Sequence, residues 1–202
     1  FICGYEVFLG FFNFVPVCLC AYSLERFSMR VLGIDPGIAV TGYGVVEEKQ
    51  RSLISIGWGT INTSAQKSFS LRLGRLFQRV NDLIKDYKPE ALAVEEPFLA
   101  RNVRMALNIG QARGAAILAG VNAGLEVASY TPLQVKLAVV GYGRAEKAQV
   151  QEMVKRLLNL EEIPRPDHAA DALALAICHL HTINSRISIN HESTKLRRHE
   201  NK

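Results

Sequence analysis

Residues 30–47 read RVLGIDPGIAVTGYGVVE, which combines strand-like runs with turn-forming residues. Residues 31–34 form an apolar strand pattern that ends on Asp35, and residues 40–46 form a second strand pattern directly after it. Between them, Asp-Pro-Gly is favourable turn chemistry, because proline fixes φ and glycine tolerates a positive φ. A turn explains the short connection, but a carboxylate at the end of a central strand is costly to bury unless a cation meets it. The stretch therefore predicts a pair of strands with a candidate functional residue at Asp35.

The rest of the pattern predicts one mixed sheet flanked by helices. Strand patterns occupy residues 30–35, 40–48, 52–61, 91–96 and 127–130, and helical spacing occupies residues 70–87, 102–123, 132–140, 145–159 and 167–182. The run ALAVEE at 91–96 is almost wholly apolar, which is typical of a buried parallel strand. Three antiparallel strands, followed by alternating helices and strands, indicate an α/β domain over residues 29–182.

The two ends of the chain fall outside this domain. Residues 1–28 are apolar but interrupted by Asn13 and Pro16, lack the basic start of a signal peptide, and are short for a membrane span. We predict a non-native or disordered extension before Met29, with a membrane anchor as the alternative. Residues 183–202 hold five basic residues against two acidic ones and are predicted to form a basic flexible tail.

Composition restricts the class of protein without identifying it. The chain has 202 residues and a formal net charge of +5, which is compatible with a nucleic-acid partner but does not require one. The four cysteines form no CxxC pair, so neither a structural zinc site nor a disulfide framework is expected, and a cytoplasmic location fits. The sequence also lacks a phosphate-binding loop of the GxxxxGK[ST] type.

Acidic residues converge on one edge of the predicted sheet. Asp35 and Glu95 both end strands, and the carboxyl ends of neighbouring parallel strands line a crevice where ligands bind. His168 and Asp171 stand three residues apart at the start of the last predicted helix and share one face of a turn. Asp167 is the better helix cap, because Asp171 lies deeper among alanine and leucine. Clustered carboxylate oxygens suit Mg²⁺ or Mn²⁺, so these residues predict a metal-dependent phosphoryl-transfer site.

Several motifs, taken together, resemble the RuvC family of Holliday-junction resolvases. The motifs are GIDPGIAVTGYGVV, AVEEPFLARN, IGQARGAAILAGVNAG, TPLQVKLAVVGYGRAEKAQVQEMV and PRPDHAADALALAICH, in the family's order from about Met29 to about His181. The resemblance implies a ribonuclease-H-like fold with a mixed five-stranded sheet, and two Mg²⁺ ions per active site with Mn²⁺ as a substitute. It also implies a homodimer that nicks four-way DNA junctions symmetrically, alongside a branch-migration motor and with no membrane partner, during recombination and DNA repair.

The resemblance also assigns roles to individual residues. It places the metal site on Asp35, Glu95 and Asp171, with His168 at a fourth position that is aspartate in many members, so that Asp167 competes with His168 for this role. It makes Phe98 a wedge or stacking platform against an unpaired junction base. The basic residues expected at the DNA are Arg101, Arg104, Arg113, Lys136, Arg144 and Lys147, of which Lys136 and Lys147 match positions that touch phosphate. For the homodimer, the predicted interface is one face of the helix over 102–123, comprising Met105, Ile109, Ala112 and Ala116.

Three other functions share parts of this pattern. A non-catalytic junction-binding protein would keep the basic residues but would have no need for three converging acids. A sugar kinase or chaperone-like ATPase also opens with a strand, an aspartate and a glycine turn, but it needs a duplicated second half that this chain lacks. A related ribonuclease-H-like nuclease that acts on RNA is the strongest alternative.

Overall fold

A mixed five-stranded sheet forms the centre of the protein, in the strand order β3-β2-β1-β4-β5. The computed structural model describes the backbone of residues 28–96 and 103–199, and the side chains as far as residue 185. β1 (Met29–Asp35), β2 (Val40–Lys49) and β3 (Ser52–Asn62) are antiparallel neighbours. β4 (Ala91–Glu95) runs parallel to β1, and β5 (Glu126–Tyr130) runs parallel to β4. The predicted mixed α/β sheet is confirmed.

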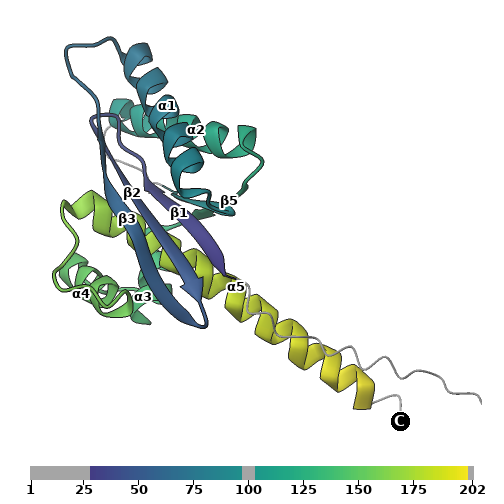
Figure 1. Ribbon diagram of the computed structural model, residues 1–202. Helices are drawn as coiled ribbons and strands as arrows, with labels where there is room; N and C mark the ends of the chain where they lie inside the picture. Colours follow the sequence, from purple (N-terminus) through teal and green to yellow (C-terminus); the bar gives the residue numbers. More distant parts are fainter. Residues whose placement is uncertain (1–27, 97–102, 200–202) are drawn as a thin grey trace, which may run out of the picture.

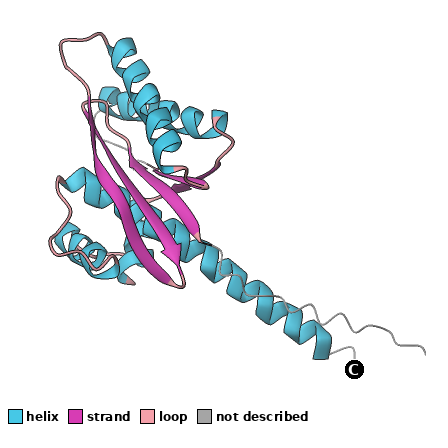
Figure 2. Cartoon of the chain, viewed as in Figure 1, coloured by secondary structure: helices cyan, strands magenta, loops and turns pink. Residues whose placement is uncertain are grey.

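Helices cover both faces of this sheet (Figures 1 and 2). On one face lie α1 (Phe69–Tyr87) and α2 (Val103–Asn122), which pack on each other and on the sheet. On the other face lie α3 (Pro132–Val140), α4 (Lys147–Leu157) and α5 (Asp167–His199). Among the described residues, no helix is both long enough and apolar enough to span a membrane.

The alternation of side chains along β1 explains the two cores. Leu32 and Ile34 are fully buried in the cluster beneath α1 and α2, whereas Val31 is fully buried in the cluster beneath α5. Successive side chains of a strand point to opposite faces, so a strand covered on both sides has to be apolar at every position. β4 is likewise covered on both sides, and its residues 91–94 are all apolar and buried.

Glycines in β1 and β2 allow α5 to lie directly on the strands. A Cβ atom at Gly33 would stand 2.0 Å from the carbonyl oxygen of Ala172, and one at Gly42 would stand 1.9 Å from the carbonyl oxygen of His168. Any side chain larger than hydrogen at either position would push α5 away from the sheet. The glycines in β1 and β2 therefore leave room for the backbone of the helix that begins at Asp167.

The last helix is longer than the sequence pattern predicts. The prediction ended it at about residue 182, where the apolar spacing ends, but α5 continues as helix to His199 and extends beyond the sheet (Figure 1). Neither glycine nor proline occurs after Pro166, so the sequence contains no signal that would stop the helix. The other element boundaries agree with the prediction to within about two residues.

The predicted dimer face of α2 is wrong in part. Ala112 and Ala116 are fully buried inside the chain's own core, in the cluster that α2 forms with α1 and the sheet. Small residues at this spacing allow close helix packing, and here the packing is internal. The exposed face of α2 carries other residues, which include Val103, Leu107, Leu118 and Val121.

Candidate metal centre

Two carboxylates meet at the ends of β1 and β4. The parallel register pairs Ile34 with Val94, so that Asp35 and Glu95 end neighbouring strands at the same edge of the sheet. Asp35 is only 9% exposed. Burial raises the pKa of Glu95 to about 8, and the charge of Asp35, a hydrogen bond with Asp35 and the charge of Asp171 act in the same direction. The edge therefore brings together two carboxyl groups that are partly shielded from water.

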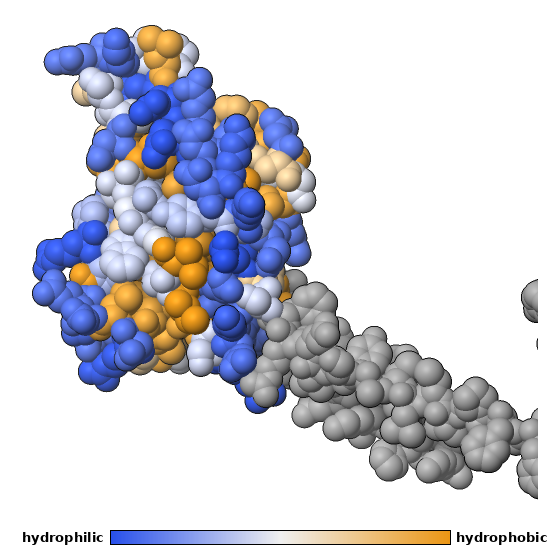
Figure 3. All heavy atoms as spheres, in the orientation of Figure 1, coloured by the Kyte–Doolittle hydropathy of each residue, from blue (hydrophilic) through white to orange (hydrophobic). Residues whose placement is uncertain are grey.

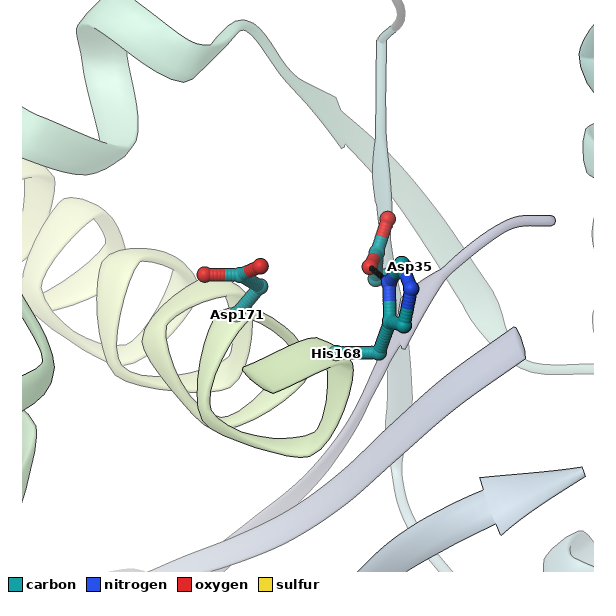
Figure 4. Close-up of side chains that lie close together, drawn as sticks. All are labelled: Asp35, His168 and Asp171. Carbon is teal, nitrogen blue, oxygen red and sulfur yellow. Dashed lines mark hydrogen bonds and ion pairs between the residues drawn. The ribbon is translucent and has the colours of Figure 1, made fainter. Parts of the chain in front are cut away.

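The first turn of α5 adds an imidazole and a third carboxylate to this edge. His168 Nδ1 lies 2.6 Å from Asp35 Oδ2, and Asp171 follows one turn along the helix (Figure 4). One ligand atom from each of Asp35, His168 and Asp171 lies within 4.8 Å of the others. The packing of α5 on Gly42 produces this arrangement, because it presses the backbone of His168 against β2.

Lys147, at the start of α4, is the cation that faces these acids. Its Nζ donates to Asp171 Oδ2 at 2.8 Å and lies 3.6 Å from Asp167 Oδ2. Burial acts to lower the pKa of Lys147, but the hydrogen bond and charge of Asp171 and the charge of Asp167 outweigh it, so the pKa is raised. Burial raises the pKa of Asp171, and Lys147 opposes that rise. One lysine thus partly offsets three carboxylates.

A cavity of about 190 Å³ opens beside the acids. Its polar lining consists of Glu95, Lys136, Lys147 and Asp171, and its apolar wall includes Val135 and Val150. The donors at this edge are carboxylate oxygens and one imidazole, which fit a divalent cation such as Mg²⁺ or Mn²⁺. A metal would also relieve the repulsion that raises the pKa of Glu95. The donor set therefore fits the predicted cofactor.

The structure brings together all four predicted site residues but distributes the predicted DNA contacts unevenly. Lys136 and Lys147 line the cavity, and Arg144 is exposed between α3 and α4. Arg104 is exposed in the first turn of α2, while Phe98 and Arg101 lie outside the described residues. These positions are compatible with a nucleic-acid path past the acids.

Arg113 has a different environment from the one expected of a DNA contact. Its Nε donates to the carbonyl oxygen of Glu95 at 3.1 Å, and its Nη2 donates to Ser129 Oγ at 2.6 Å. The guanidinium group thereby ties the ends of β4 and β5 to α2. No local sequence pattern predicts this contact, because it joins three elements that are far apart in the chain.

The loop after Asp35 is fixed by a threonine that sequence reasoning missed. Thr41 Oγ1 donates to the carbonyl oxygen of Gly37 at 2.5 Å and accepts from the Gly37 amide at 3.2 Å. A hydroxyl four residues after a glycine can bond to both the amide and the carbonyl group of that glycine. This spacing is the sequence signal that could have predicted the turn. The bonds hold the turn that positions the end of β1.

The fold and this edge together define an α/β nuclease of the ribonuclease-H-like class. The family model "Crossover junction endodeoxyribonuclease RuvC" matches residues 31–179, so the chain belongs to the RuvC family. This result confirms the predicted family, fold and enzyme class.

Individual relatives agree with the family match. The RuvC protein of Caldanaerobacter subterraneus subsp. tengcongensis is 58% identical over 156 residues, which cover 77% of this chain and 94% of the relative. The Thermus thermophilus RuvC structure is 41% identical with a TM-score of 0.73, covering 78% of this chain and 96% of that chain. T. thermophilus RuvC in complex with a Holliday junction substrate is 39% identical with a TM-score of 0.72 at the same coverage.

Proposed function

We propose that this chain is a Mg²⁺-dependent endonuclease that resolves Holliday junctions by paired symmetric nicks in recombination and DNA repair. The observation that carries the proposal is the meeting of Asp35, Glu95, His168 and Asp171 at one edge of the sheet. The solved complex of T. thermophilus RuvC with a Holliday junction substrate supports the choice of substrate.

The same four residues are the proposed ligands of two Mg²⁺ ions. When bound, the ions supply Lewis acidity toward the phosphodiester that is cut. Asp35 also orients the imidazole of His168 through the 2.6 Å contact to Nδ1, which leaves Nε2 as the ring's other donor atom. Asp167 is the weaker candidate for the fourth position, because its carboxylate is 57% exposed and lies beside Lys147.

Basic residues around the cavity are the proposed contacts to the DNA backbone. Lys136 and Lys147 line the same cavity as Glu95 and Asp171, so a phosphate drawn to them would lie next to the acids. Arg104 and Arg144 would extend this path, and Phe98 and Arg101 remain proposed contacts from the family resemblance. For Arg113 we propose a positioning role, because its donors are directed to the carbonyl oxygen of Glu95 and to Ser129.

Two nicks on one junction require two active sites, and a two-fold homodimer would supply them. The exposed face of α2 is the proposed interface, since its apolar residues and glycines recur at spacings of three and four. This stripe comprises Val103, Leu107, Gly110, Gly114, Leu118 and Val121. From the family we further propose a cytoplasmic protein that works beside a branch-migration motor.

The decisive experiment uses the purified full chain, a labelled mobile four-way junction and a matched linear duplex. We expect paired nicks in the junction with Mg²⁺, none with EDTA, and little cutting of the duplex. Cutting of an RNA–DNA hybrid in preference to the junction would favour the RNA nuclease. Binding of the junction without cutting at any Mg²⁺ or Mn²⁺ concentration would favour the non-catalytic binder.

A further inference from the structure

A second polar cavity lies where β3 leads into α1, on the other side of β2 from the acids. We call it the β3–α1 corner, and its volume is about 390 Å³. Its lining is Leu71 and the polar residues Asn62, Thr63, Ser64, Lys67, Arg72 and Arg75. The corner contains three basic side chains and no acidic one. Figure 3 shows mostly hydrophilic surface at this end of the molecule, and Figure 1 places the loop there.

The frame of the corner is fixed to the loop that follows Asp35. Arg72 Nε donates to Thr63 Oγ1 at 3.0 Å, and Arg72 Nη2 donates to the carbonyl oxygen of Ile38 at 3.1 Å. The Thr63 amide donates to the carbonyl oxygen of Ala39 at 3.0 Å, and its hydroxyl donates to that of Ile38. Arg72 is thus a structural residue that ties the corner to the loop following Asp35.

Lys67 and Arg75 have a different environment from that of Arg72. Both are exposed, and neither forms an ion pair within the described part of the chain. One turn further along α1, Arg79 is paired with Asp82 at 3.1 Å. The sequence places no Asp or Glu between Glu48 and Asp82, and the described residues that line the corner include no carboxylate.

The corner lies within reach of DNA bound at the acids. Asp35 pairs with Gly42, and Gly42 pairs with Thr60, so two strand spacings of about 4.8 Å each separate β1 from β3. The corner follows directly after Asn62, at the edge of the sheet where β1 also ends. A separation of about 10–15 Å corresponds to roughly three or four steps along a duplex that rises 3.4 Å per base pair.

We propose that the β3–α1 corner binds phosphates of a junction arm that leads away from the metal centre. Lys67 and Arg75 contact the phosphate oxygens, and Arg72 holds the corner in register with the cleavage site. The corner would thereby set the direction in which the arm leaves the acids. This inference rests on the proposed function, because it takes a four-way DNA junction as the ligand.

The test compares two charge-matched double variants of the full chain. Lys67→Gln with Arg75→Gln removes two charges at the corner, whereas Lys49→Gln with Arg51→Gln removes two at the β2–β3 hairpin, at the opposite end of the sheet. Junction affinity is measured against salt concentration without divalent metal. Each lost phosphate contact lowers the log–log salt slope by about one, so we expect a fall of about two per protomer, or about four for the proposed homodimer, in the corner variant and none in the hairpin variant.

Two further measurements distinguish a failure of the corner inference from a failure of the proposed function. Lys67→Arg with Arg75→Lys keeps both charges and should retain the wild-type slope. Methylphosphonate substitution within about five nucleotides of the cut should weaken wild-type binding but leave the corner variant unaffected. If wild-type protein binds and cuts the junction while both double variants show equal slopes, the corner inference is overturned and the function stands. If wild-type protein neither binds nor cuts the junction, the proposed function fails first.

Discussion

Burial and two neighbouring carboxyl groups act against the charged form of Glu95. Its pKa is raised to about 8 by burial, by Asp35 and by Asp171, with Lys147 acting in the opposite direction. An acid that is neutral near pH 7 in the free chain has to release its proton before it can bind a cation. Cation binding and the ionisation of Glu95 are therefore linked.

The first prediction removes one carboxylate charge at a time. Each of three variants, Asp35→Asn, Glu95→Gln and Asp171→Asn, should bind the junction but fail to cut it. The reason is that these side chains are proposed to bind the metal and not the DNA. Loss of an outer-shell partner lowers activity by about 10–100-fold, so loss of a direct donor should exceed about 100-fold. Single-turnover cleavage and junction affinity are measured together. A variant that cuts at near the wild-type rate would remove that residue from the ligand set.

The second prediction concerns stability and pH in the metal-free chain. The folded-state pKa of Glu95, about 8, exceeds the ordinary value of 4.5, so between these pH values the native state binds more protons than the unfolded state. Native stability at this site is therefore complete below about pH 4.5 and is lost as pH rises toward 8. Glu95→Gln stays neutral, so its melting temperature should rise relative to wild type from pH 5 to pH 8. A constant difference across this range would contradict the raised pKa.

The third prediction decides between His168 and Asp167 for the fourth position. His168 lies 2.6 Å from Asp35, whereas Asp167 is exposed and lies beside Lys147. His168→Ala should therefore reduce cutting strongly and Asp167→Ala only weakly, at saturating Mg²⁺. His168→Asp should restore Mg²⁺-dependent cutting and reduce any preference for Mn²⁺, which accepts nitrogen ligands more readily. The opposite ranking of the two alanine variants would assign the position to Asp167.

At the scale of elements, the position of α5 on the sheet connects packing with chemistry. The helix carries His168 and Asp171, and it lies against β1 and β2 only because glycines leave room for its backbone. A displacement of the helix would move both side chains relative to Asp35. The fold therefore contributes to the site through backbone contact as well as through the side chains themselves.

The fourth prediction uses glycines in two environments. Gly42→Ala places a Cβ 1.9 Å from the carbonyl oxygen of His168, so it should destabilise the chain by at least about 1–3 kcal/mol and reduce cutting. Gly74→Ala, in α1, meets no heavy atom within 4 Å and should stabilise the chain by about 0.5–1 kcal/mol with cutting unchanged. Thermal melting and cleavage of both variants are compared. Equal melting temperatures would show that α5 can shift without loss.

The same elements show how far the sequence alone can predict this protein. The apolar spacing predicts the strands and helices, and the ends of the strands predict Asp35 and Glu95, because both signals are local. The sequence does not predict the bond from Arg113 to Glu95 or the pairing of Lys147 with Asp171, since these contacts join elements that are distant in sequence. The predicted end of α5 was also wrong, because the apolar spacing ends at about residue 182 whereas the helix continues to His199.

At the scale of the whole molecule, the described residues place one set of acids at one edge of the sheet. The proposed paired nicks on a four-way junction would need two such sets in fixed relation, so the proposed mechanism requires two copies of the chain. A Cβ atom added at Gly110 or Gly114 would meet no packed neighbour within 4 Å, and Leu107 and Leu118 beside them are 60% and 54% exposed. A second copy packed on this stripe would cover apolar surface that the single chain leaves in water.

The fifth prediction tests that arrangement. Leu107→Glu with Leu118→Glu adds like charges to the stripe, which would face each other across a two-fold axis, so sedimentation should shift from dimer to monomer. The charge-matched control is Gln78→Glu with Lys85→Gln, at exposed positions of α1 outside the β3–α1 corner. The stripe variant should bind the junction more weakly and give single, uncoordinated nicks, while the control remains a dimer that gives paired nicks. Wild-type protein that sediments as a monomer both free and on DNA would exclude the dimer, and a dimer that survives in the stripe variant would move its interface away from α2.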